Sequence, residues 1–104
     1  MLLAMEKDLK IMTAASSMEA LELVSMHPPN LVISDLHLSN GMNGMEIIRQ
    51  ARSTTNRQIP AILLTGDTSK NTEELDREGI VVLIKPVETE KLISTIKRLL
   101  AELA

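Results

Sequence analysis

Three short apolar runs constrain the fold more than any other feature of this sequence. They are rich in Val, Ile and Leu, and each leads into one polar side chain: residues 31–34 precede Asp35, residues 61–64 precede Thr65, and residues 81–84 precede Lys85. Runs without polar alternation are typical of strands buried on both faces of a parallel sheet. The segments between them are long enough for the helices that parallel crossovers require.

The carboxyl ends of parallel strands meet at one edge of a sheet, where the sites of open α/β proteins lie. The sequence therefore predicts an α/β fold in which the carboxylate of Asp35, the hydroxyl of Thr65 and the ammonium of Lys85 converge.

Composition narrows the function classes. With 104 residues, the chain forms one domain, residues 1–104, and cannot hold a second core. It has no aromatic residue for stacking on bases and a net charge of −3, which argues against direct nucleic-acid binding. No cysteine is present, and no apolar stretch approaches the roughly 18 residues of a membrane span. Residues 1–5 are too short for a signal-peptide core. We expect a cytoplasmic protein without membrane contact.

The residues before Asp35 predict a helix, a strand and a second helix. Residues 1–9 mix apolar and charged side chains in the pattern of the last turns of an amphipathic helix. Residues 10–15 predict a strand. Ser16 and Glu19 have the spacing of a capping box that begins a helix, and the prolines after His27 end it.

Three further helices are predicted after Asp35. The first has an apolar stripe of Met45, Ile47, Ile48 and Ala51 and ends in the polar residues 53–56. The second, residues 69–78, contains a single large apolar residue, Leu75, so we expect it to be weakly anchored before Gly79 ends it. The last helix has a broad stripe of Leu92, Ile93, Ile96, Leu99, Leu100 and Leu103.

Residues 31–38, 41–44, 62–66 and 85–87 resemble the receiver domain of two-component response regulators, and the resemblance covers essentially the whole chain. It implies a flavodoxin-like three-layer sandwich with a central parallel sheet. It also implies a signalling module rather than an enzyme, and a cis peptide bond between Lys85 and Pro86.

The resemblance implies a role for each of the three polar residues that follow the apolar runs. Asp35 would be the phosphoacceptor, served by a histidine kinase or a histidine phosphotransfer protein. Thr65 would contact the phosphoryl group and Lys85 would be its cationic partner, since the charge on the transferred oxygens must be neutralised. In that family Mg²⁺ bridges the acceptor carboxylate, the backbone carbonyl two residues later (here His37) and an acidic pair. Movement of Thr65 would switch the adjacent loop and helix, residues 66–78.

The sequence departs from the family at its beginning. A complete receiver begins with an apolar strand that ends in two adjacent acids and leads into a first helix, whereas this chain begins near the end of that helix. We therefore expect an N-terminally truncated receiver that lacks its first strand, between residues 10–15 and 31–35. Glu6 and Asp8 are the only acids before Glu19, and neither comes after a strand-like run. The strands over residues 10–15 and 31–35 would then each have an unpaired edge. We expect these edges either to pair directly with each other or to exchange strands between the subunits of a homodimer.

Two alternative functions remain open. A phosphorylation-independent pseudo-receiver would act only as a protein-interaction module. The missing acidic pair favours it, as does Val82, which stands where the family usually has an aromatic switch residue. A phosphatase of the haloacid dehalogenase type also uses Asp, Ser or Thr, and Lys at successive strand ends. It needs a second Asp where this chain has His37, and a larger chain.

Overall fold

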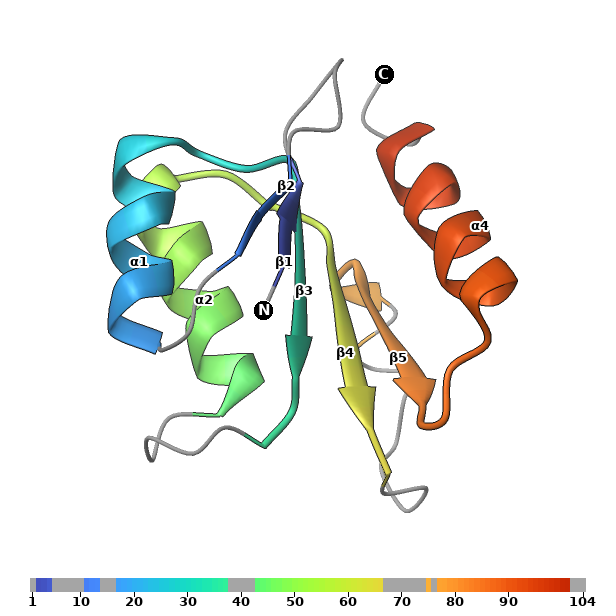
Figure 1. Cartoon of the computed structure of the whole chain (residues 1–104). Coiled ribbons are helices and arrows are strands. Elements are labelled where there is room, and N and C mark those ends of the chain that lie inside the picture. Colours follow the sequence, from blue (N-terminus) through green and yellow to red (C-terminus); the bar gives the residue numbers. More distant parts are fainter. Residues whose placement is uncertain are drawn as a thin grey trace.

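The computed structural model has an α/β fold of three layers, as the sequence predicts. It describes residues 2–4, 11–13, 17–37, 43–66, 75 and 77–101. One five-stranded sheet lies between helices, with α1 and α2 on one face and α4 on the other (Figure 1). In chain order the elements are β1 (Leu2–Ala4), β2 (Ile11–Thr13), α1 (Ser17–Met26), β3 (Leu31–Asp35), α2 (Gly44–Thr55), β4 (Ala61–Thr65), β5 (Ile80–Ile84) and α4 (Thr89–Ala101).

The three apolar runs form the parallel part of the sheet, as predicted. The strand order is β2-β1-β3-β4-β5, and β4 pairs in parallel with both β3 and β5. Asp35 lies opposite Leu64, and Thr65 lies opposite Ile84. The strands that lead to Asp35, Thr65 and Lys85 are therefore adjacent and end at the same edge of the sheet.

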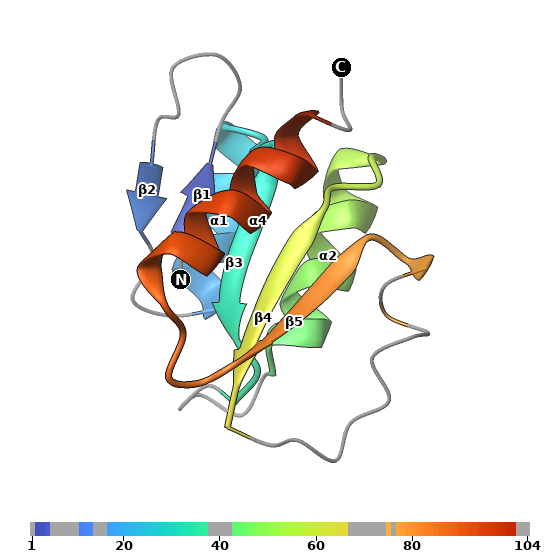
Figure 2. The same cartoon turned by 90° about the vertical axis from the view of Figure 1, so that its right-hand side faces the viewer.

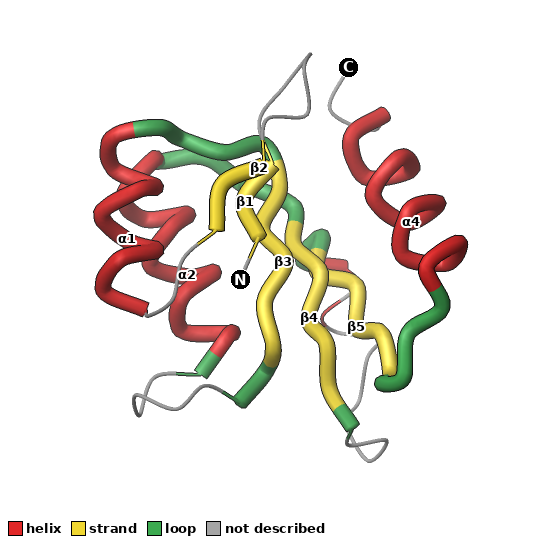
Figure 3. Tube along the Cα trace, viewed as in Figure 1, coloured by secondary structure: helices red, strands yellow, loops and turns green. Residues whose placement is uncertain are grey.

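The prediction of a helix over residues 1–9 is wrong for Leu2–Ala4, which form a strand, and residues 5–9 lie outside the described residues. β1 lies between β2 and β3 (Figure 3). It runs antiparallel to both, with Leu3 opposite Met12 of β2 and opposite Val32 of β3. The position expected to be empty is thus filled by a strand of the opposite direction. The physical reason is that the backbone N–H and C=O groups of β2 and β3 need partners, which β1 supplies.

Two apolar cores explain why the parallel strands lack polar alternation. Successive strand residues point to opposite faces, and both faces are covered. On one face, Val24 of α1 and Ile48 of α2 pack with Val32 of β3. The other face is covered by α4 (Figure 2), and there Leu99 of α4 packs with Ile33 of β3.

Local signals set the helix ends. α1 ends at Met26, before the predicted proline stop, and α2 begins at the N-cap Asn43, whose side chain accepts the Glu46 N–H at 2.9 Å. Gly79 has φ +78°, in the left-handed region that favours glycine. Ile93 was expected in the core stripe of α4 but is 45% exposed, because this one helix buries a narrower stripe, centred on Thr95 and Leu99.

Several predictions fall outside the described residues: the role of Ser16 in capping, most of the helix over residues 69–78, and the place of Leu103. Within the described part of the chain, no helix combines the length and the apolar character needed to cross a membrane.

Candidate functional site

The three predicted site residues lie at the carboxyl edge of the parallel strands. Asp35 is the last residue of β3, Thr65 is the last residue of β4, and Lys85 comes directly after β5. The backbone fixes this edge, because the Leu36 N–H donates to the Leu64 carbonyl at 2.9 Å and the Lys85 N–H donates to the Thr65 carbonyl at 2.8 Å. The structure therefore confirms that the three strands bring Asp35, Thr65 and Lys85 to the same edge of the sheet.

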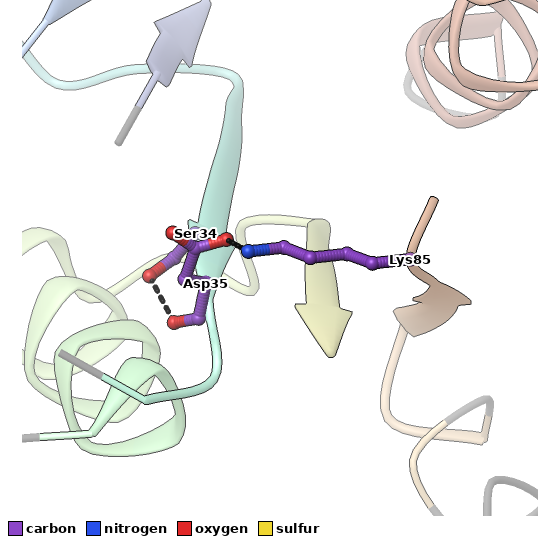
Figure 4. Close-up of polar contacts among 3 residues, drawn as sticks. All are labelled: Ser34, Asp35 and Lys85. Atoms are coloured by element: carbon purple, nitrogen blue, oxygen red, sulfur yellow. Dashed lines mark hydrogen bonds and ion pairs between the residues drawn. The ribbon is translucent and has the colours of Figure 1, made fainter. Parts of the chain in front are cut away.

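Asp35 and Lys85 form an ion pair across this edge. The Lys85 Nζ lies 2.7 Å from the Asp35 Oδ1 (Figure 4). The side chain of Lys85 is 49% exposed and that of Asp35 is 45% exposed. A half-exposed pair contributes little to stability, because water screens it. Both charged groups are open to a ligand, so the pair fits a binding role better than a structural one. The bond between Lys85 and Pro86 is cis, as the resemblance implies.

Thr65 belongs to the strand that lies between those of Asp35 and Lys85. Its side chain is buried, with 3% exposure, next to the half-exposed pair. The structure thus brings Asp35 and Lys85 into direct contact and places a hydroxyl-bearing residue at the end of the intervening strand. The role assigned to Thr65 stays a prediction.

Two residues that the sequence did not single out support the backbone of Asp35. Ser34 is buried, and its hydroxyl donates to the Asp35 carbonyl oxygen at 2.8 Å (Figure 4). Gly44 comes so close that a Cβ atom there would collide with the same carbonyl oxygen, and its N–H donates to the Leu36 carbonyl at 2.8 Å. A polar residue inside an apolar run, and a glycine inside the first turn of a helix, were the signals in the sequence.

The described residues do not provide the donor set that the family uses for Mg²⁺. Mg²⁺ requires six oxygen ligands in near-octahedral geometry. Asp35 offers a carboxylate, and His37, which is exposed, offers its backbone carbonyl. Within the described part of the chain, no three His, Cys, Asp or Glu residues are grouped so that they could hold a metal ion.

The direction of β1 explains why β1 brings no acidic residue to the side of Asp35. Its last residue, Ala4, lies opposite Leu31, at the far end of β3 from Asp35, and Ile11 of β2 lies there too. Glu6 and Asp8, the acids considered for the metal, are outside the described residues.

Comparison with known proteins decides the family. The model of the response regulator receiver domain matches residues 1–97. The chain belongs to this family. Receiver domains are modules of two-component signalling, so the predicted class of protein and its flavodoxin-like fold are confirmed.

Individual receivers agree with this assignment. The polar-differentiation response regulator DivK of Brucella ovis is 32% identical over 90 residues, which cover 84% of this chain and 72% of DivK. Among solved structures, the chemotaxis protein CheY4 of Vibrio cholerae is 30% identical, with a TM-score of 0.69 over 85% of this chain and 75% of CheY4. The receiver domain of the Francisella response regulator 1452 has a TM-score of 0.73 over 89% of this chain and 77% of its own; at 22% identity it supports the fold alone.

Proposed function

We propose that this receiver domain accepts a phosphoryl group on Asp35 from the phosphohistidine of a histidine kinase or a histidine phosphotransfer protein. The observation that carries the proposal is the half-exposed contact between Asp35 and Lys85, 2.7 Å apart, at the carboxyl edge of the parallel strands. A half-exposed carboxylate beside a half-exposed cation is within reach of a ligand, which supports the choice of Asp35 as the nucleophile.

The transfer is a displacement at phosphorus. A carboxylate oxygen of Asp35 attacks, the new O–P bond forms, the N–P bond to the imidazole breaks, and the imidazole takes a proton from water. The ammonium of Lys85 is displaced from the carboxylate to a phosphoryl oxygen and neutralises the charge there. The product is an acyl phosphate on Asp35.

The hydroxyl of Thr65 is the second contact for the phosphoryl group. Because Gly66 and the residues up to Glu78 come directly after Thr65, its movement would pull on this segment, which forms the proposed switch, residues 66–78. Val82 is half-buried on β5 and has no ring whose rotation could report the change. The signal would therefore pass through the backbone of the switch segment.

Intact-mass spectrometry tests the proposal directly. The purified domain is incubated with acetyl phosphate, with and without Mg²⁺. We expect a gain of one phosphoryl group, which Asp35→Asn abolishes and which Glu46→Gln, a change at an exposed carboxylate of α2, leaves in place. A folded wild-type domain that gains no phosphoryl group from this donor or from a phosphorylated histidine phosphotransfer protein would refute phosphorylation at Asp35.

A specific observation favours the alternative, a pseudo-receiver that acts as a protein-interaction module without phosphorylation. β1 lies between β2 and β3 and runs antiparallel to both, and the described residues lack the donor set for Mg²⁺. The two functions differ in their response to Asp35→Asn. A pseudo-receiver would bind its partner protein equally well with this substitution, whereas a phosphoacceptor would lose the response to the phosphoryl donor.

A further inference from the structure

A small hollow lies at the edge of the sheet opposite the candidate site. It is a space of about 110 Å³, formed by the segments that lead into β3 at Leu31 and into β4 at Ala61 (Figure 1). Asp35 lies four residues, or about 13 Å, further along β3 than Leu31. The hollow is therefore separate from the site of the proposed phosphorylation. Its lining residues are Pro29, Asn30, Arg57, Gln58, Ile59 and Pro60.

Hydrogen bonds fix the walls of this hollow to the rest of the fold. The Val32 N–H donates to the Pro60 carbonyl at 3.1 Å, and the Arg52 Nε donates to the Ile59 carbonyl at 2.9 Å. Ile59 and Pro60 are themselves buried. The shape of the hollow is thus set by the sheet and by α2, so a ligand would not have to order its walls on binding.

Arg57 and Asn30 supply N–H donors to the hollow. The Arg57 Nη2 donates to the Asn30 Oδ1 at 3.2 Å. A guanidinium can only donate, so the Asn30 amide turns its oxygen toward Arg57 and keeps two N–H donors for another partner. Asn30 is only 8% exposed, yet within the described residues these donors have no acceptor. No fully buried polar side-chain atom in this part of the chain lacks a partner, so the donors reach open space, which for Asn30 is the hollow that it lines.

The lining of the hollow favours a carboxylate with a short aliphatic chain. Arg57 is exposed and has no acidic partner among the described residues, and Gln58 adds a further amide. A charged, planar guanidinium beside amide donors selects an anion and matches the geometry of a carboxylate. The other walls, Pro29, Ile59 and Pro60, are apolar, and the prolines have no N–H to donate. They suit carbon atoms better than the hydrated oxygens of phosphate.

We propose that this hollow binds a short-chain organic acid, whose carboxylate contacts Arg57 and Asn30 and whose carbon atoms lie against the two prolines. Pockets for larger ligands measure about 300–1,000 Å³, so a space of about 110 Å³ admits a short acid and excludes a nucleotide. The site uses no residue of the edge that carries Asp35, so the inference stands independently of the proposed function.

Titration of the isotope-labelled domain with sodium propionate, followed by NMR shifts of the backbone amides at constant ionic strength, tests the binding. We expect saturating shifts at residues 57–59 with a Kd on the order of 10 mM, because an exposed arginine binds weakly. Propionamide, which has the same size without the charge, should give no saturating shift, and inorganic phosphate should bind several-fold more weakly. Equal or tighter binding of either compound, saturating shifts that spare residues 57–59, or no saturation up to about 100 mM would overturn the proposal.

Three variants assign the binding to this hollow. Arg57→Gln removes the charged donors and should raise the Kd for propionate about tenfold. Arg49→Gln, the same change at an exposed arginine of α2 that does not line the hollow, should leave the Kd unchanged. Asn30→Asp keeps an acceptor for Arg57 but replaces the N–H donors with a carboxylate oxygen, so propionate binding should be lost while the urea midpoint of unfolding does not fall. Unchanged binding in Arg57→Gln or in folded Asn30→Asp, or an equal loss in Arg49→Gln, would overturn the site.

Discussion

Replacement of Gly44 by alanine should destabilise the domain and disturb the candidate site at the same time. A Cβ atom on Gly44 would collide with the Asp35 carbonyl oxygen and would lie 2.8 Å from Leu63 Cδ2 and 3.0 Å from Ser34 Oγ. Carbon atoms prefer separations of about 3.5–4.0 Å, so the Leu63 contact alone is too short by roughly 0.7 Å. The carbonyl oxygen belongs to the backbone of β3 and cannot rotate away as a side chain would.

The expected cost depends on two opposing effects. Overpacking in a filled core costs about 1–3 kcal/mol. Alanine in place of glycine in a helix contributes up to about 1 kcal/mol in the other direction. We therefore expect Gly44→Ala to lower the free energy of unfolding by about 1–2 kcal/mol. With a urea dependence of roughly 1.5 kcal/mol per molar, the midpoint of unfolding would fall by about 1 M.

The chain offers a matched control at Gly66. A Cβ atom there has no heavy atom within 4 Å, so Gly66→Ala should change the stability by less than about 0.5 kcal/mol. Urea unfolding monitored by circular dichroism measures both variants. If Gly44→Ala unfolds at the same urea concentration as Gly66→Ala, the close approach of α2 to β3 does not support the backbone of Asp35.

Substitutions at three further positions test separate contacts. Asn43→Ala removes the acceptor for the Glu46 N–H and should cost about 1 kcal/mol in urea unfolding, whereas Asn43→Asp should retain the stability of the wild type. Gly79→Ala places a Cβ atom at φ +78°, which should cost about 1–2 kcal/mol and lower the Tm by several degrees in a thermal scan. Lys85→Ala removes the partner of Asp35; stability should change by less than about 1 kcal/mol, because the pair is half-exposed. Phosphorylation by acetyl phosphate should slow roughly 100-fold. A Lys85 variant that is unstable yet phosphorylated at the wild-type rate would assign the residue a structural role instead.

The parallel strands could be predicted because their signal lies in the residues themselves. Residues 31–34, 61–64 and 81–84 are apolar on both faces, and the strands found there differ from these runs by a residue at most at either end. The contact between Asp35 and Lys85 is a result of topology, since parallel strands share their carboxyl edge.

Other features depend on packing that no local pattern records. Leu2–Ala4 is too short for its periodicity to distinguish a strand from a helix, and the space between β2 and β3 decided the outcome. Ile93 belongs to an apolar stripe by spacing, yet it is 45% exposed because α4 presents a narrower face to the sheet. The role of Gly44 depends on how closely α2 approaches β3.

The direction of β1 bears directly on the chemistry of Asp35. A parallel strand in this position would end beside Asp35 and could bring acids to it, whereas β1 ends opposite Leu31, four residues or about 13 Å further back along β3. Within the described residues, the ion partner of Asp35 is therefore Lys85 alone. Phosphorylation should accordingly depend strongly on Lys85. If it also requires Mg²⁺, the ligands that Asp35 and His37 do not supply must come from outside the described residues. Asp67, two residues after Thr65 in the sequence, is the first acid to replace by asparagine, because β4 leads the chain to this edge.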